Sequence, residues 1–335
     1  MTPSLFDLGL YRFERRFRRL SQPLGNTQGS GGRIPQRGYE PRRSRGCEDE
    51  TPLASRDPLE GEDVSEPVLL VEDLGPVRRL TMNRPGSLNA LNKDLVDAMS
   101  RALDEAADDG DVRVLILRGA GRAFSAGYDL DEDATGGVLD ARQWQEELEH
   151  STEEMLKFFD HPKPVIASVH SYCLAGATDL MLACDLAVAA DDAYFGYVDV
   201  RFGSGVVSMF LPWVVGVRAA KELLFTGEDR VAADEALRIG LVNRVVPREE
   251  LDEATLKLAE EIAKNEPFVI QATKRAVNRV WDAAGFREAM AANTELDVLI
   301  ETANLPARDE FRRITTERGL KAAIAWRDAA FRGDA

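Results

Sequence analysis

Cysteine and histidine are scarce in this sequence of 335 residues, which contains three of each. The three cysteines, Cys47, Cys173 and Cys184, are too few for a disulfide framework, and this favours a reducing compartment such as the cytoplasm. Neither residue type shows the paired spacing of metal ligands, so we expect no metal site. No apolar run approaches the ~18 residues that a membrane-spanning helix needs, so we expect no membrane span.

Positive charge is also in deficit. The chain has 42 Lys and Arg against 58 Asp and Glu, which gives a net charge of −16. A strongly acidic chain is a poor general binder of nucleic acid, because contacts to phosphate dominate that affinity. We therefore expect no nucleic-acid partner for the main part of the chain.

The charge is unevenly distributed near the N-terminus. Residues 1–45 contain ten Arg, no Lys and three acids, whereas residues 46–66 contain one Arg and eight acids. Residues 1–66 lack sustained apolar periodicity, so we expect a mostly disordered extension, first Arg-rich and then acidic. A basic amphipathic helix over Leu8–Leu20 would suit a transit peptide for the mitochondrial matrix or an arm for an acidic partner. We favour a dispensable tail or a start codon placed too far upstream.

From Val68 onward, strand-like and helix-like segments alternate, which predicts an α/β fold. Val68–Val71 and Val77–Met82 are β-rich runs joined by a Gly-Pro turn, and they predict a hairpin. Val112–Leu117 and Val165–His170 are nearly uninterrupted apolar runs, as in strands that are covered on both faces. Beyond Pro212 the pattern is almost entirely helical.

Four short stretches carry the most specific signal. They are Asn83–Leu91 (NRPGSLNAL), Gly121–Leu130 (GRAFSAGYDL), His161–Ala167 (HPKPVIA) running into Leu174–Asp179 (LAGATD), and Ala193–Asp199 (AYFGYVD). Their order and spacing resemble the crotonase superfamily, the enoyl-CoA hydratase/isomerase family, over about residues 68–332.

The resemblance implies a crotonase-like spiral of ββα units over residues 67–265 and a helical C-terminal trimerisation part over residues 266–335. It implies assembly as a homotrimer or a homohexamer. Leu296, Leu299, Ile300, Ile314 and Leu320 are the candidate packing residues. It also implies an acyl-CoA substrate, with coenzyme A as part of the substrate and no permanently bound cofactor.

Two glycine-containing loops would let backbone N–H groups approach a thioester oxygen closely. By the resemblance, the amides of Tyr128 and Gly176 form the oxyanion hole, which stabilises the negative charge of an enolate. The resemblance also assigns coenzyme A binding to the loop that holds Ala126, Tyr128, Asp129 and Leu130, together with Gly176.

Hydration of a double bond needs a base for water and an acid for the α-carbon, and two carboxyl groups can supply both. The hydratases of this family use two glutamates, and the matching positions here are Asp179 and Asp199. Each side chain is one methylene shorter, so its carboxyl group reaches about 1.5 Å less far. We expect Asp179 and Asp199 to be the catalytic residues.

The segment after Asp199 departs from the hydratase pattern because it is shorter, and Arg201 and Phe202 in it would fill or charge the acyl pocket. No acid lies between Val200 and Lys221, which counts against dienoyl-CoA isomerisation and aryl-CoA dehalogenation. Lys274 and Arg327 lie in helices that resemble those contacting coenzyme A.

We therefore expect hydration of 2-enoyl-CoA thioesters to 3-hydroxyacyl-CoA. Within the family, the alternatives are an enoyl-CoA double-bond isomerase and an acyl-CoA or β-diketone hydrolase. Outside catalysis, the alternatives are an RNA-binding protein that uses the Arg-rich tail and a non-catalytic protein that binds coenzyme A. The fold alone does not decide between these reactions.

Overall fold

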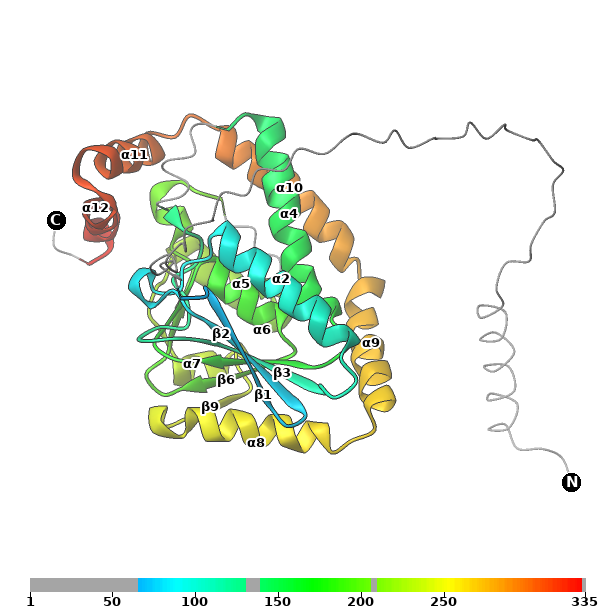
Figure 1. Ribbon diagram of the computed structural model, residues 1–335. Helices are drawn as coiled ribbons and strands as arrows, with labels where there is room; N and C mark the ends of the chain where they lie inside the picture. Colours follow the sequence, from blue (N-terminus) through cyan, green and yellow to red (C-terminus); the bar gives the residue numbers. More distant parts are fainter. Residues whose placement is uncertain (1–65, 131–138, 206–209, 333–335) are drawn as a thin grey trace, which may run out of the picture. The chain divides into compact units, whose positions relative to one another are not determined.

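The structure is a computed structural model, and residues 66–130, 139–205 and 210–332 are described here (Figure 1). The expectations for the Arg-rich and acidic extension fall outside the described residues, except at Glu66.

A six-stranded sheet lies at the centre, in the spatial order β1-β2-β3-β4-β6-β9. β1 and β2 pair antiparallel, and every other neighbouring pair is parallel. The strands are Leu69–Leu74 (β1), Val77–Met82 (β2), Val114–Gly119 (β3), Val165–Val169 (β4), Leu186–Ala190 (β6) and Arg244–Val246 (β9). The predicted hairpin is confirmed, and Gly75 takes the left-handed conformation, at φ 63°, that its tight turn requires.

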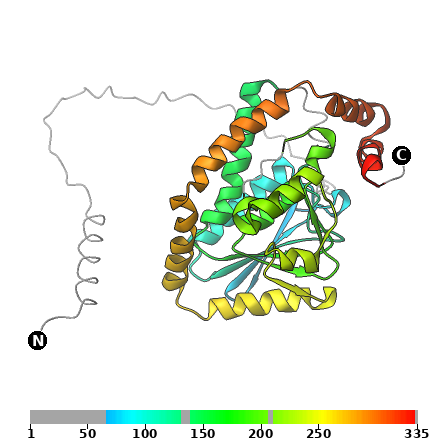
Figure 2. The same cartoon turned by 180° about the vertical axis from the view of Figure 1, so that it is seen from behind.

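Both faces of this sheet are covered, as the apolar runs predict. Alternate residues of β3 point to opposite faces: Val114 and Ile116 pack against α8 (Leu251–Ala263). Leu115 and Leu117 belong to the larger core, which also holds apolar residues of several helices, three of which cover the opposite face of the sheet. Those three helices are α2 (Lys93–Asp108), α4 (Ala141–Asp160) and α5 (Gly176–Ala183). In Figures 1 and 2, α8 (yellow) lies below the sheet, and α2, α4 and α5 lie above it.

A second, smaller sheet has candidate site residues just after the ends of two of its strands. It contains β5 (Tyr172–Leu174), β7 (Tyr194–Gly196) and β8 (Val231–Ala232), in the order β5-β7-β8. β5 follows β4 in sequence, and β7 follows β6. Each buried central strand thus continues into a short strand whose end carries a candidate site residue: Gly176 begins α5 just after β5, and Asp199 follows β7.

The remaining elements of the described residues are α-helices and 3₁₀ helices. The α-helices are α6 (Leu211–Thr226), α7 (Ala233–Arg238), α9 (Pro267–Ala283), α10 (Phe286–Thr302), α11 (Pro306–Arg318) and α12 (Leu320–Arg332). The 3₁₀ helices are η1 (Pro85–Ser87), η2 (Asp199–Phe202) and η3 (Arg248–Glu250). The predicted α/β class with a helical C-terminal part is confirmed.

Two contacts of the C-terminal helices bear on the candidate site. α10 runs beside α4 (Figures 1 and 2), where the rings of Phe159 and Phe286 lie 5.3 Å apart between centroids. α11 and α12 pack against each other and against η2, and Phe202 stacks on Phe311 at 4.6 Å. Both contacts bring C-terminal residues close to the segment that begins at Asp199.

Candidate active site

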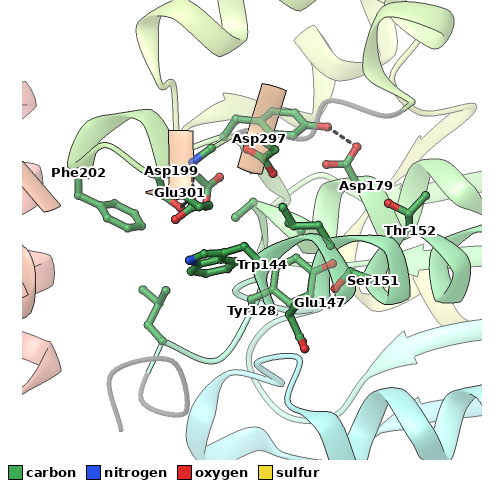
Figure 3. Close-up of a pocket in the computed structure, with 17 residues that line it drawn as sticks. Tyr128, Trp144, Glu147, Ser151, Thr152, Asp179, Asp199, Phe202, Asp297 and Glu301 are labelled. Carbon is green, nitrogen blue, oxygen red and sulfur yellow. Dashed lines mark hydrogen bonds between the residues drawn. The ribbon is translucent and has the colours of Figure 1, made fainter. Parts of the chain in front are cut away.

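One cavity, of about 150 Å³, brings the predicted site residues together with residues of the C-terminal helices (Figure 3). Its lining combines acidic and aromatic side chains, and among the described residues that line it there is no Lys, Arg or His. The acidic residues are Glu147, Asp179, Asp199, Asp297 and Glu301, and the aromatic residues are Tyr128, Trp144, Tyr197 and Phe202.

Tyr128 lies on a loop that is fixed by one buried side chain. The Asn89 amide donates to the carbonyls of Ala120, Ala123 and Phe124 at 2.9 to 3.1 Å. Asp129 N–H bonds to the Leu91 carbonyl at 3.1 Å. Within the described residues, these backbone contacts leave Tyr128 N–H without a backbone acceptor. Loop N–H groups in this position are available to an oxygen of a bound molecule.

The second loop places Gly176 at the start of α5. Ala175, which precedes it, has φ 53° and ψ −130°, a conformation that costs an L-residue free energy and is found where a site requires it. Gly176 is in the first turn of the helix, where N–H groups have no partner within the helix. A β-carbon on Gly176 would lie 2.4 Å from Cε2 of Tyr128, so glycine lets the two loops come together.

Asp179 lies one turn into α5 and is 5% exposed. The Tyr197 hydroxyl donates to its Oδ1 at 3.3 Å (Figure 3). Burial raises the pKa of the Asp179 carboxyl well above its ordinary range, and the nearby Asp199 raises it further. Hydrogen bonds from Tyr197 and from the Phe210 backbone oppose this rise. Burial therefore favours the protonated form of Asp179.

Asp199 is the first residue of η2 and lines the same cavity. Burial raises the pKa of its carboxyl to about 6, while its own backbone N–H and the Arg327 guanidinium oppose the rise. Near pH 7, Asp199 is therefore mostly ionised, whereas burial favours the protonated form of Asp179. Two carboxyl groups whose pKa values differ can serve as a base and an acid in one site.

The C-terminal wall of the cavity comes from α10 and the residues after η2. Asp297 and Glu301 lie one helical turn apart on α10, and both line the cavity. Glu301 Oε1 accepts hydrogen bonds from the Ser204 hydroxyl at 2.7 Å and from Gly205 N–H at 2.6 Å. Burial raises the pKa of Asp297 to about 7, and Glu301 and Asp199 add to the rise.

Arg308, at the start of α11, holds this wall together. Its guanidinium donates to the Glu301 carbonyl at 2.6 Å and to the Ile300 carbonyl at 2.9 Å. It also donates to the Gly203 carbonyl. The side chain is 5% exposed and lies 3.4 Å from Glu301 Oε2, so it compensates that buried carboxylate. The residues after Asp199 are thereby tied to the C-terminal helices.

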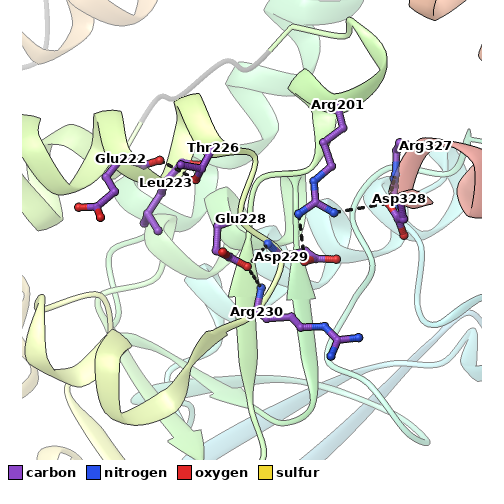
Figure 4. A network of polar contacts seen from close by, with 9 residues as sticks. All are labelled: Arg201, Glu222, Leu223, Thr226, Glu228, Asp229, Arg230, Arg327 and Asp328. Carbon is purple, nitrogen blue, oxygen red and sulfur yellow. Dashed lines mark hydrogen bonds and ion pairs between the residues drawn. The ribbon is translucent and has the colours of Figure 1, made fainter. Parts of the chain in front are cut away.

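The predicted roles of Arg201 and Phe202 separate in the structure. Phe202 lines the cavity, as expected for a residue that fills it. Arg201 is absent from the described lining and is directed to Asp229 at 3.1 Å and Asp328 at 3.5 Å (Figure 4). Its guanidinium also lies 4.6 Å from the ring centre of Phe331. Arg201 therefore links η2 to α12, and its positive charge does not lie in the cavity.

The cations expected near coenzyme A make contacts within the chain. Lys274 pairs with Asp185 at 2.7 Å, and its side chain is 8% exposed. Arg327 bonds to Asp328 at 2.7 Å and lies 6.0 Å from the ring centre of Phe202.

In the predicted coenzyme A loop, Asp129 bonds to Arg84 at 2.8 Å. Leu130 lines the cavity, and Ala126 N–H bonds to the Leu88 carbonyl at 3.0 Å.

Sequence reasoning missed the residues that reach the cavity from other helices. Trp144 and Glu147 come from α4, and Asp297 and Glu301 come from α10. On a helix surface an acidic residue is most simply a solvated charge, so spacing alone gives no signal for the last two. Tyr197 lies two residues before Asp199, inside one of the four motif stretches. A tyrosine hydroxyl within an apolar run could have indicated a buried hydrogen-bonding role there.

Residues 66–130, 139–205 and 210–332 lack two features that would suggest other functions. Among these residues, no helix is long and apolar enough to cross a bilayer. Within the same ranges, no group of three or more His, Cys, Asp or Glu side chains is arranged to hold a metal ion.

An α/β fold that brings two buried carboxyl groups of unequal pKa to one cavity suits an enzyme of acid–base chemistry. Residues 74–310 match the family model described as enoyl-CoA hydratase/isomerase. The chain belongs to this family.

Individual relatives agree with the assignment. The chain is 36% identical over 217 residues to the short-chain-enoyl-CoA hydratase of Clostridium acetobutylicum, covering 63% of this chain and 81% of that protein. The crystal structure of an enoyl-CoA hydratase/isomerase from Xanthobacter autotrophicus Py2 is 42% identical, with a TM-score of 0.77 over 79% of this chain and 98% of that one. An enoyl-CoA hydratase from Mycobacterium smegmatis is 28% identical, with a TM-score of 0.72 over 78% and 93% of the two chains. The crotonase-like fold is thus confirmed.

Proposed function

We propose that this enzyme hydrates 2-enoyl-CoA thioesters to 3-hydroxyacyl-CoA. The observation that carries the proposal is the meeting of Asp179 and Asp199 with the Tyr128 and Gly176 loops at one cavity, in a chain of this family. The thioester oxygen is held by the N–H groups of Tyr128 and Gly176. These donors stabilise the negative charge that the oxygen gains as the enolate forms.

The two carboxyl groups divide the proton transfers. Ionised Asp199 accepts a proton from water as the water oxygen bonds to the β-carbon and the double-bond electrons move toward the thioester oxygen. Neutral Asp179 then delivers its proton to the α-carbon as the enolate collapses. Transfer of a proton from Asp199 back to Asp179 restores the starting state, so that one water is added and no proton is lost or gained.

The test follows the loss of conjugated enoyl absorbance with crotonyl-CoA and with a bulkier 2-enoyl-CoA. Asp179→Asn and Asp199→Asn should each lower kcat by roughly 10²–10⁴-fold, the usual range for a lost general acid or base. Asp234→Asn, which alters an exposed carboxylate on α7, should leave kcat unchanged. A folded wild-type enzyme that turns over neither substrate contradicts the proposal.

Double-bond isomerisation is the second candidate, because Asp199 is the mostly ionised member of the carboxyl pair near pH 7. An isomerase needs one carboxylate, which removes a proton from the α-carbon of a 3-enoyl-CoA and returns it to the γ-carbon. Conversion of 3-enoyl-CoA that survives Asp179→Asn but not Asp199→Asn would favour this reaction over hydration.

For the surroundings of the site, we propose that Ala126, Asp129 and Leu130 lie along the bound coenzyme A. The enzyme needs no permanently bound cofactor. The free buried thiols of Cys173 and Cys184 support a reducing, cytoplasmic setting. The compartment is tested by locating the tagged full-length chain in cells.

We also propose a homotrimer or homohexamer. Apolar side chains on α9 and α10 support this assembly: Val277 is 62% exposed, Val280 67%, Leu296 58% and Leu299 65%. Of the packing residues predicted from the sequence, Ile314 is instead buried within its own chain, against Phe202 and Phe311. Sedimentation equilibrium of the purified protein tests the assembly, and a monomer at micromolar concentration contradicts it.

A further inference from the structure

The cavity contains a buried acceptor that the proposed hydration does not use. Asp297 is 4% exposed, and within the described part of the chain its Oδ1 has no hydrogen-bond partner. A buried polar atom without a partner is destabilising, and it persists where a site requires it. Figure 3 shows the Asp297 carboxyl group in the cavity wall, near Asp199 and Glu301.

Gly205 makes room for this acceptor. A β-carbon on Gly205 would lie 1.4 Å from Asp297 Oδ1, so any other residue there would displace the carboxyl group. Gly205 N–H is already bound to Glu301 at 2.6 Å and is not free to donate to Asp297. The backbone therefore accommodates the unpartnered oxygen without satisfying it.

The neighbouring groups explain why the partner should come from a ligand. Both oxygens of Glu301 face donors: Oε1 accepts from Ser204 and Gly205, and Oε2 lies 3.4 Å from Arg308. Asp297 has no such arrangement at Oδ1. The described lining of the cavity offers no Lys, Arg or His to fill the role. Because Asp297 lines the cavity, a hydrogen-bond donor on the bound molecule would give its carboxyl group a partner, whereas a purely alkyl chain would give it none.

We propose that Asp297 is a specificity-determining residue that selects acyl-CoA thioesters whose acyl chain carries a hydrogen-bond donor, a hydroxyl or an ammonium group. This inference rests on the proposed function, because it assumes that the acyl chain occupies this cavity. It assigns Asp297 to the choice of substrate rather than to proton transfer. A site with a buried acceptor discriminates strongly against ligands that leave the acceptor unpaired.

The experiment measures binding without turnover. Saturated acyl-CoA thioesters with four- and six-carbon chains, ending in methyl, hydroxyl or ammonium, are titrated into the full-length protein by calorimetry. At one chain length, wild type should bind a donor-bearing thioester at least about tenfold more tightly than its methyl counterpart, as expected for a hydrogen bond to a buried carboxyl group. Equal or tighter binding of the methyl thioesters at both lengths overturns the inference.

Two substitutions of Asp297 distinguish a hydroxyl donor from an ammonium donor on the acyl chain. Asp297→Leu should reverse the order, so that the methyl thioester binds best. Asp297→Asn keeps an acceptor but no charge, so it should retain a preference for hydroxyl and lose a preference for ammonium. An unchanged order in a folded Asp297→Leu protein overturns the inference, and if that variant does not fold, the wild-type and Asn titrations decide.

Thr294→Val is the matched control. Thr294 is 5% exposed and lies one turn before Asp297 on α10, but it does not belong to the described cavity lining. Its hydroxyl donates to the Met290 carbonyl within the helix, at 3.2 Å. This variant disturbs the same helix and should leave the order of affinities unchanged. If Thr294→Val reverses it as well, the effect is one of helix packing and the inference fails.

Turnover of crotonyl-CoA by the same preparations separates this inference from the proposed function. Hydration without any donor preference removes the specificity role and leaves the hydratase proposal standing. A donor preference without hydration of either crotonyl-CoA or a 2-enoyl-CoA that ends in a hydroxyl group removes the hydratase proposal and leaves Asp297 as a binding residue.

Discussion

Two walls of the cavity differ in construction. The first, made of the Tyr128 loop and the start of α5, carries the backbone N–H groups proposed to bind the thioester oxygen, together with Asp179, and backbone hydrogen bonds between loops hold it in place. The second, made of α10 and the residues that follow Asp199, faces the cavity with carboxyl side chains. Asp199 lies where the two walls meet.

The difference indicates that the two walls have different functions. Backbone donors cannot be changed by most substitutions, so a wall built from them supports the step that all members of a reaction class share. Side-chain carboxyl groups can be exchanged one residue at a time, so a wall built from them can set the choice of acyl chain. Three substitutions test this difference.

The largest effect is expected in the first wall. Gly176→Ala places a β-carbon 2.4 Å from the Tyr128 ring, so the ring or the Gly176 amide must move. Displacing one oxyanion donor should lower kcat by about 10²-fold, with a smaller change in KM. Steady-state hydration kinetics measure the change. Gly110→Ala is the control, because a β-carbon there meets nothing within 4 Å.

A smaller effect is expected where the second wall is anchored. Arg308→Gln removes donors to the carbonyls of Gly203, Ile300 and Glu301, so the residues after Asp199 lose part of their support. We expect kcat to fall by roughly tenfold, because misplacement of a catalytic group is costly even when the group itself is intact.

The control for this substitution lies on the same helix. Arg313→Gln removes exposed ion pairs with Glu310 and Glu317, which contribute little to stability. It should not change kcat. A loss of activity as large as that of Arg308→Gln would show that any damage to α11 suffices.

The smallest effect concerns stability within the second wall. The folded-state pKa of Asp297, about 7, lies above its ordinary value of 3.8, so the folded protein binds an extra proton between these values. Wild-type stability therefore declines as the pH rises through this window, and Asp297→Asn lacks that contribution.

In urea unfolding, the free energy of unfolding of Asp297→Asn relative to wild type should rise by on the order of 1 kcal/mol from pH 5 to pH 8. The difference between the proteins isolates Asp297, although Asp199, Glu301 and Arg308 also face it. A gap that stays constant with pH would mean that Asp297 is ionised throughout this range.

The first wall and the central strands could be predicted from the sequence. The hairpin, the apolar strands and the Gly-rich loops are local patterns, and the four motifs fix the positions of Tyr128, Gly176, Asp179 and Asp199 along the chain. The structure brings all four to one cavity. Their chemical roles remain predictions.

The second wall could not be predicted, because it depends on packing between distant segments. Gly205 and Glu301 are 96 residues apart, and Gly203 and Arg308 are 105 apart. Neither pair belongs to a periodic pattern. Arg201 and Lys274 show the converse difficulty, since a cation in a promising segment was in each case directed to a carboxylate of its own chain.

The order of the walls along the chain has a consequence for biosynthesis. A ribosome makes every residue of the first wall before it reaches α10, so a nascent chain holding residues up to Asp199 already contains the Tyr128 loop and the start of α5. The carboxyl wall exists only once Asp297 and Arg308 have been translated and α11 has docked on η2. The cavity of an emerging chain is therefore incomplete until synthesis has passed α11, by which point all strands of the central sheet have already been made.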